Sequence, residues 1–375
     1  MAIRKEITYL HIAKALGIIA MVMGHCDLLT NFVYQFHMPL FFFISGFLHR
    51  DDNTLSLRNL LDFFRRKIKS YYIPYLKVTI LFLIVLDIYG QNWFILNPCP
   101  LQDITWFYFF DRLTGIMLLS GRNLSQMLGA IWFLRYLLII SMLFELAIYI
   151  WRFYQKLFGM RYSVIMLILF LLIFILLLLL QIHKPVIMVP ESGILLLVYF
   201  AYYFAGYVVM NSFYVSSFFI KIIASPWSLS LFLIPIISSY VSKGYHDLLW
   251  FPITYLFAFS GIMALLTFSN LCDNKLETLR TMLIFIGKNT FYILVWHFTF
   301  FKIITCLQIL IYGLPWEKAS AFPILPCGFG WRLAYLCIGV AGPLGLGFVF
   351  NRFKLAFLQS IALLKQKLCS NCVFL

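Results

Sequence analysis

The chain has 375 residues, of which 63% are hydrophobic and only 11% are charged. A soluble domain carries about 25% charged residues, so the composition excludes an ordinary soluble protein and predicts an integral membrane protein. The net charge is +15, but the basic residues lie mainly in short connectors, where they set topology and contact anionic headgroups. We therefore expect the lipid bilayer, and no nucleic acid, as a partner.

Apolar segments of membrane-spanning length recur along the whole chain. A helix needs about 20 predominantly apolar residues to cross the hydrocarbon core, and the run 163–182 meets this length without a charge. The sequence predicts an all-α integral membrane protein with about ten transmembrane helices, forming a single domain over residues 1–375. The predicted helices are 8–29, 32–49, 73–95, 128–151, 162–182, 191–211, 226–242, 248–271, 282–312 and 331–351.

The charges of the connectors predict how these helices are oriented. With the N-terminus in the cytoplasm, eighteen Lys and Arg residues fall on the cytoplasmic side and six on the opposite side. This bias agrees with the positive-inside rule, and an even number of helices also places the C-terminus in the cytoplasm. We expect the first apolar segment to be retained, because it lacks a small-residue cleavage site.

The first predicted helix carries two polar residues on one face. Lys14 and His25 are eleven residues apart, a spacing of about three turns and about 16 Å along a helix. A charge at the bilayer centre costs at least about 2.5–3.5 kcal/mol, so this face is expected to meet a cavity or a partner helix. In the alternative interpretation, Lys14 snorkels to the headgroups and His25 caps the helix near the interface.

The second predicted helix and the basic segment after it add four candidate binding residues. The second helix reads FHMPLFFFISGFLHR and contains His37 and Ser45. His37 is a candidate substrate ligand, or it makes a hydrogen bond to a neighbouring helix. The run RRKIKSYYIPY contains Arg66 and Lys69, which either determine topology or hold a phosphorylated cofactor at the cytoplasmic face.

The later helices contribute the remaining candidates. The binding candidates are Arg135, the pair Lys288 and Asn289, and His297. The pair and His297 are eight to nine residues apart, which predicts overlapping faces of one helix. Glu145 is expected to pair with Arg135 or Arg152. The Cys369 and Cys372 pair has C-x-x-C spacing, but no second pair or His cluster accompanies it, and we predict no metal site.

Five short motifs point to one family. In chain order they are AKALGIIAMVMGHC, FHMPLFFFISGF, KIKSYYIPY, WFLRYLLIIS and IGKNTFYILVWH. They resemble the acyltransferase 3 family over residues 8–300, and most of all its fucose 4-O-acetylase-like branch. The strongest pieces lie in the first 75 residues.

The resemblance implies a ten-helix enzyme of the cell envelope. Such a protein takes an acyl group, usually acetyl from acetyl-CoA as co-substrate, and places it on a hydroxyl of a polysaccharide or lipid-linked sugar. It also implies a bacterial cytoplasmic or inner membrane location and no tightly bound cofactor. The family's first-helix histidine corresponds to His25. Lys14 stands where many members have arginine, and Ser70 and Tyr71 stand where arginine is common.

The chemistry of histidine fits this expectation. A sugar hydroxyl is a weak nucleophile until a base takes its proton, and histidine suits that role near neutral pH. His25 is therefore the candidate catalytic residue, either as general base or as a transiently acylated relay. Asp27 is the only nearby acid and should point elsewhere on a continuous helix. A flippase for lipid-linked sugars and a structural membrane subunit remain as alternatives.

Overall fold

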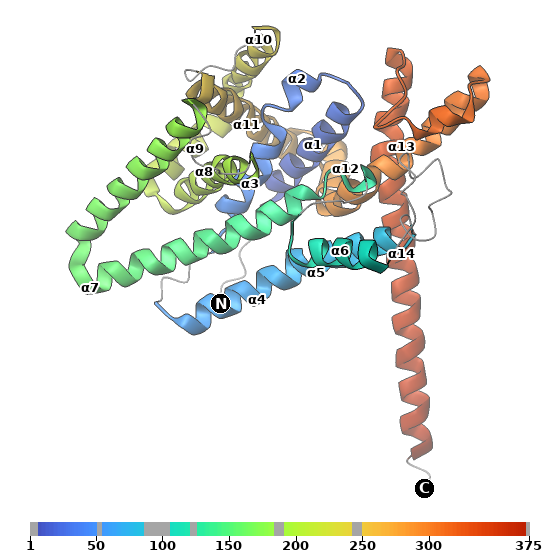
Figure 1. Cartoon of the computed structure of the whole chain (residues 1–375), viewed down its shortest axis with the longest axis horizontal. Coiled ribbons are helices and arrows are strands. Elements are labelled where there is room, and N and C mark those ends of the chain that lie inside the picture. Colours follow the sequence, from blue (N-terminus) through green and yellow to red (C-terminus); the bar gives the residue numbers. More distant parts are fainter. Residues whose placement is uncertain are drawn as a thin grey trace.

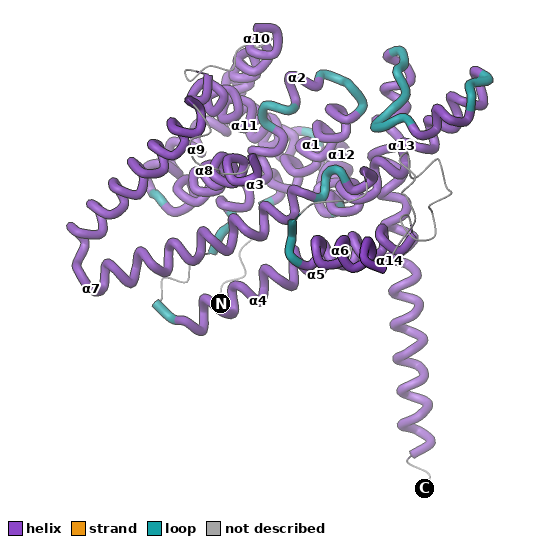
Figure 2. The backbone as a smooth tube through the Cα atoms, in the orientation of Figure 1, coloured by secondary structure: helices purple, strands orange, loops and turns teal. Residues whose placement is uncertain are grey.

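The computed structural model describes residues 7–50, 55–85, 106–120, 126–183, 191–241 and 250–372. Every regular element in these ranges is helical, and no strand occurs among them (Figures 1 and 2). The chain is therefore an all-helical protein, as the composition predicts.

Helix α1 (Thr8–His25) lies at the centre of the helical body, packed against α3, α11 and α12. Ten of its residues are buried, and they are distributed around the helix rather than on one stripe. The predicted end at residue 29 is wrong, because Asp27 and Leu29 have positive φ angles, which a right-handed helix does not accommodate. His25 is consequently the last residue of the helix.

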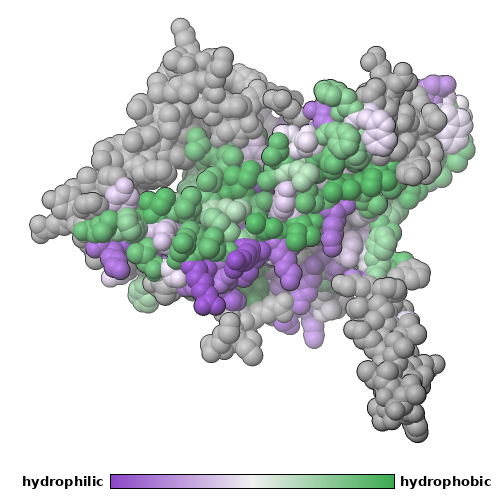
Figure 3. Space-filling view, turned by 60° about the horizontal axis from the view of Figure 1, so that its bottom comes forward, coloured by the Kyte–Doolittle hydropathy of each residue, from purple (hydrophilic) through white to green (hydrophobic). Residues whose placement is uncertain are grey.

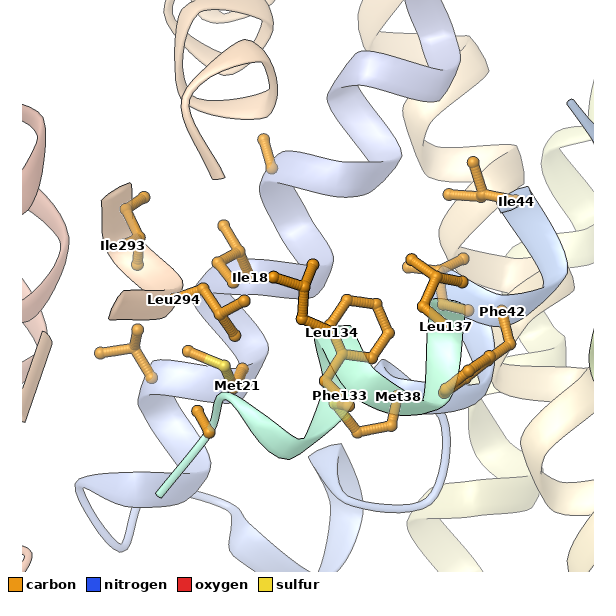
Figure 4. Close-up of a cluster of buried hydrophobic side chains, with 14 of the residues drawn as sticks. Ile18, Met21, Met38, Phe42, Ile44, Phe133, Leu134, Leu137, Ile293 and Leu294 are labelled. Carbon is orange, nitrogen blue, oxygen red and sulfur yellow. The ribbon is translucent and has the colours of Figure 1, made fainter. Parts of the chain in front are cut away.

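The prediction of a single helix over 32–49 is also wrong, because this segment forms two helices. A short helix α2 (Thr30–Val33) is followed by a break and then by α3 (His37–Phe47). Apolar side chains of α1, α3, α7 and α13 meet beside these pieces in one buried core (Figure 4). This core supports the C-terminal half of α1, which ends at His25.

Helix α3 packs closely against α8 (Glu191–Asn211) through two glycines. A Cβ atom at Gly46 would lie 1.8 Å from the carbonyl oxygen of Tyr203, and one at Gly206 would lie 2.0 Å from that of Phe43. The two backbones therefore touch directly, in the manner of small-residue contacts between membrane helices.

The segment predicted as helix 73–95 begins earlier in the structure. Helix α4 (Leu57–Lys67), the π-helical turn η1 (Ile68–Tyr72) and α5 (Ile73–Phe82) follow one another without a break. The predicted end lies outside the described residues. The basic run is thus helical. Pro74 lies inside this continuous stretch, directly after the π-helical turn, and its missing N–H removes one helix hydrogen bond there.

The two predicted helices 128–151 and 162–182 form one continuous helix, α7 (Trp132–His183). At the left of Figure 1 its ribbon bends sharply and reverses direction. The two predicted helices therefore correspond to the two parts of α7 on either side of this bend. Helix α7 is preceded by the short helix α6 (Trp106–Met117) and the 3₁₀ turn η3 (Gln126–Leu128).

The following segment contains a sharp bend that the hydropathy pattern does not reveal. Helix α8 is joined to α9 (Phe213–Ala224) at an angle of 98°. The predicted helix 226–242 is divided into the 3₁₀ helix η4 (Pro226–Phe232) and α10 (Leu233–Val241). The predicted helix 248–271 corresponds to α11 (Trp250–Lys275).

The last two predicted helices differ from the structure, one by a break and the other in length. The segment 282–312 is interrupted at Asn289, between α12 (Glu277–Lys288) and α13 (Thr290–Tyr312). A connector with the 3₁₀ turn η5 (Trp316–Ser320) leads to α14 (Phe329–Cys372). Helix α14 is longer than the predicted 331–351 and extends far beyond the rest of the molecule (Figure 1).

Five of the described helices are long and apolar enough to cross a membrane, or six if the bent pair α8 and α9 counts as one span. The chain is thus a multi-pass membrane protein, while ten spans are not confirmed. Figure 3 shows a broad hydrophobic band above a hydrophilic face, which comes forward from the bottom of Figure 1 where α4 lies. The five spans are 57–85, 132–157, 253–275, 290–312 and 329–352.

Candidate active site

Two histidines from distant parts of the sequence stack against each other at the end of α1. The ring centroids of His25 and His297 are 5.3 Å apart, and the ring planes differ by 20°. Phe298 packs on both, with centroid distances of 4.8 Å to His25 and 4.0 Å to His297. The predicted candidates His25 and His297 therefore belong to one site.

The orientation of His297 is fixed by its own helix. Its Nδ1 lies 2.8 Å from the carbonyl oxygen of Ile293, so Nδ1 carries the proton that it donates. The Nε2 atom then holds a lone pair. This atom is buried, His297 being 0% exposed, and it has no hydrogen-bond partner within the described parts of the chain. An unpaired buried acceptor is costly in a structural role, which favours a ligand role for His297.

Tyr34 completes the surroundings of His25. Its hydroxyl oxygen lies 3.1 Å from Nδ1 of His25, and its ring centroid is 5.2 Å from that of His37. The contact requires Gly24, since a Cβ atom there would come within 2.0 Å of the Tyr34 ring. Sequence reasoning missed Tyr34, and the only available signal was the glycine beside the histidine.

His37 lies beside Tyr34 and is buried. Its Nδ1 is 2.8 Å from the carbonyl oxygen of Val33, one turn earlier in the same segment. Val33 is the last residue of α2, so this hydrogen bond joins α3 to the short helix that precedes it. With Nδ1–H donating, Nε2 of His37 is left as an acceptor.

No hydrogen bond or ion pair joins Asp27 to His25 in the described part of the chain, although the continuous helix from which this was predicted ends at His25. The Asp27 carboxylate pairs with the Arg332 guanidinium at 2.8 Å, and its carbonyl oxygen accepts a second hydrogen bond from Arg332 at 2.9 Å. The acid near His25 therefore anchors the start of α14 to the turn after α1. Tyr34, and not a carboxylate, is the group that contacts His25 at Nδ1.

The other predicted candidates lie outside this histidine cluster. Ser45 donates to the carbonyl oxygen of Phe41 in its own helix. Lys14 is half-buried on α1, and none of the described residues forms a hydrogen bond or ion pair with it. Arg66 and Lys69 are exposed on α4 and η1. The Arg66 guanidinium lies over the ring of Phe63.

Two further candidates donate hydrogen bonds to backbone carbonyl oxygens. Arg135 donates to the carbonyl oxygen of Leu119 at 2.9 Å. Asn289 donates to Phe285 at 2.8 Å and marks the break between α12 and α13. The expectation that Lys288 and Asn289 share a helix with His297 is wrong, because this break separates them.

A second buried polar cluster lies at the opposite end of α3. His49 Nδ1 is 2.9 Å from the Tyr203 hydroxyl, and its Nε2 is 2.9 Å from a carboxylate oxygen of Glu145. Glu145, which was expected to pair with Arg135 or Arg152, thus pairs with His49. This cluster joins α3, α7 and α8, and sequence spacing gave no signal for it.

Comparison with known proteins identifies the family. A family described as an acyltransferase domain, acyltransferase 3, matches residues 7–352. No curated protein and no solved structure shows significant similarity to the chain. The match includes the segments that carry His25, Tyr34, His37 and His297. The chain is a member of the acyltransferase 3 family and hence a membrane acyltransferase.

Proposed function

We propose that the chain is an O-acetyltransferase that moves acetyl from acetyl-CoA to a hydroxyl of a cell-surface polysaccharide or lipid-linked sugar. His25 is the catalytic residue. The observation that carries this proposal is the contact of His25 with the Tyr34 hydroxyl on one side and the His297 ring on the other. Such a pair of contacts orients an imidazole so that its second nitrogen is directed to a substrate.

In the proposed reaction His25 acts through Nε2. Its Nδ1–H donates to the Tyr34 hydroxyl oxygen, which leaves the Nε2 lone pair to accept the proton of the acceptor hydroxyl. The acceptor oxygen forms a bond to the thioester carbonyl carbon, and the carbon–sulfur bond breaks. The departing thiolate of CoA receives the proton from His25. In the alternative course, His25 is acetylated first and then passes the group to the hydroxyl.

The binding candidates keep their proposed roles on the donor and substrate side. Arg66 and Lys69 are exposed cations suited to the phosphates of acetyl-CoA. Lys14, three turns before His25 on an unbroken helix, continues that path. Arg135, Lys288, Asn289 and Ser45 are assigned to donor or substrate binding by the resemblance of their motifs.

The proposed setting is the cytoplasmic membrane of a bacterium, with both termini in the cytoplasm and ten crossings. Support comes from the asymmetry of the connector charges and from the hydrophilic face near α4 (Figure 3). We retain the fucose 4-O-acetylase-like branch and the single domain over residues 1–375 as parts of this proposal. No metal ion and no tightly bound cofactor are invoked.

The test measures transfer from radiolabelled acetyl-CoA by purified protein in detergent. The acceptor is the glycolipid and polysaccharide fraction of cells that express the His25→Ala variant. Wild-type protein should label this fraction, and His25→Ala should not, while its affinity for acetyl-CoA stays within about twofold. His11→Ala is the matched control, because it removes another half-buried histidine from the same helix. Transfer by His25→Ala at the wild-type rate would refute the assignment.

A further inference from the structure

A groove opens between the C-terminal end of α13, the following connector and the start of α14. Its volume is about 540 Å³, within the range of about 300–1,000 Å³ of small-molecule sites. Its lining includes Gln308, Tyr312, Lys318 and Trp331.

The floor of the groove is rigid and polar. The hydroxyl of Tyr335, which is 0% exposed, donates to Oε1 of Gln308 at 2.6 Å and contacts the Thr305 hydroxyl at 2.9 Å. Gln308 is itself only 3% exposed. Lys302 donates to the carbonyl oxygens of Ala319 and Ala321 at 2.9 and 2.7 Å, which holds the connector in place. The groove is therefore preformed.

The walls combine aromatic rings with hydrogen-bonding groups. The Trp331 indole N–H donates to the Tyr312 hydroxyl at 2.7 Å, which fixes the two rings 6.0 Å apart. The Lys318 ammonium and the buried amide of Gln308 add polar contacts. A sugar presents C–H faces that pack on aromatic rings and hydroxyls that bond to amides and cations, so this lining suits a saccharide.

The groove is connected to the histidine cluster from two directions. Arg332, the residue after Trp331, is bound to Asp27, two residues beyond His25. From the connector, the ring of Phe322 packs on Phe298 at 4.8 Å, and Phe298 packs on His25 at the same centroid distance. A molecule held in the groove therefore lies on the side of the protein where α1 ends.

From this arrangement we infer that the groove binds the saccharide part of the acceptor. The inference rests on the proposed function, and it assigns the acceptor site to α13, α14 and their connector. Exposed Trp and Tyr residues are also common where helices meet the membrane interface. Interfacial anchoring alone, however, does not require a buried glutamine at the floor or the hydrogen bond between the two rings.

The test is direct binding of methyl glycosides, with no donor present. A panel of methyl glycosides of glucose, galactose, N-acetylglucosamine, fucose and rhamnose is titrated against detergent-purified protein by calorimetry. Wild-type protein should bind at least one member. Trp331→Ala should weaken that binding by about tenfold, as is usual when a central tryptophan is truncated. Lys318→Ala, at an exposed position where folding is not at risk, should weaken it by a smaller factor.

The matched control is Trp316→Ala, which removes an exposed tryptophan from the same connector but outside the groove. This variant should bind the glycoside as the wild type does. Acetyl-CoA affinity, measured on every variant, reports folding. Lack of binding to the whole panel, or equal loss in Trp316→Ala and Trp331→Ala, overturns the inference. If a glycoside binds as expected but the transfer assay with acetyl-CoA detects no product, the proposed function fails and the groove remains only a saccharide-binding site.

Discussion

At the residue scale, the chemistry of the site depends on which ring nitrogen of each histidine makes a hydrogen bond and which is left free. His297 and His37 both direct Nδ1 to a backbone carbonyl one turn earlier, whereas His25 directs Nδ1 to the Tyr34 hydroxyl. His25 is at the end of its helix, where a side-chain partner replaces the backbone. Its ring is thus oriented by a group that a conservative substitution can remove.

Tyr34→Phe deletes only the hydroxyl and should lower the rate of transfer. Loss of the hydrogen-bond partner of a metal-binding histidine typically costs about 10–100-fold. We expect kcat to fall by a similar factor here, with little change in the KM for acetyl-CoA. The pH profile of kcat should also shift, because Nδ1 loses its partner. Steady-state kinetics on purified protein measures both effects.

A purely structural role for Tyr34 would give a different result. In that case Tyr34→Phe would reduce the yield or melting temperature and leave the kcat of the folded fraction and its pH profile unchanged. Tyr292→Phe is a suitable control, since it also deletes a tyrosine hydroxyl, one that contacts Asn351 and lies outside both the histidine cluster and the groove.

The sequence identified the histidines of the site but not their arrangement. His25, His37 and His297 stand out because polar side chains are expensive within apolar helices. Their proximity depends on how α1 and α13 pack, and no local spacing encodes a contact between residues 25 and 297. Tyr34 and the His49–Glu145 pair were missed for the same reason.

At the scale of elements, the breaks between helices are what hydropathy could not predict. Long apolar segments flank the short breaks at Gln35, Ser212 and Asn289 on both sides, so a sliding average joins segments that the backbone separates. The converse holds in α7, where a polar connector was expected and the helix is continuous. The close approach of two helices is a second feature at this scale, and it is determined by glycines.

Gly46→Ala should destabilise the protein through the α3–α8 contact. The new Cβ would meet the carbonyl of Tyr203, a backbone atom that cannot move without separating the helices. Overpacking of this kind typically costs about 1–3 kcal/mol, and we expect a lower melting temperature in detergent. Gly345→Ala in α14 is the matched control, since a Cβ there meets nothing within 4 Å. Equal melting temperatures for Gly46→Ala and the wild type would contradict the close packing.

At the scale of the whole molecule, the two polar clusters lie at opposite ends of α3. His37 begins this helix and His49 follows its end, a separation of twelve residues or about 18 Å along a helix. The histidine cluster lies toward the α13–α14 connector, and His49 lies toward the side of basic α4. On the proposed function, this arrangement predicts that the donor approaches from one side of the membrane and the acceptor from the other.

The orientation of α14 gives the test of this arrangement. Its segment Phe329–Arg352 is apolar enough to span the membrane and lies between the groove connector and the C-terminus. A reporter inserted after Lys318 and another fused after Leu375 should therefore report opposite sides, with the C-terminal one cytoplasmic. Alkaline phosphatase and green fluorescent protein fusions measure this, because the former is active outside the cytoplasm and the latter inside. Should both positions report one side, α14 would not cross the membrane, and the donor and acceptor could not be assigned to opposite faces.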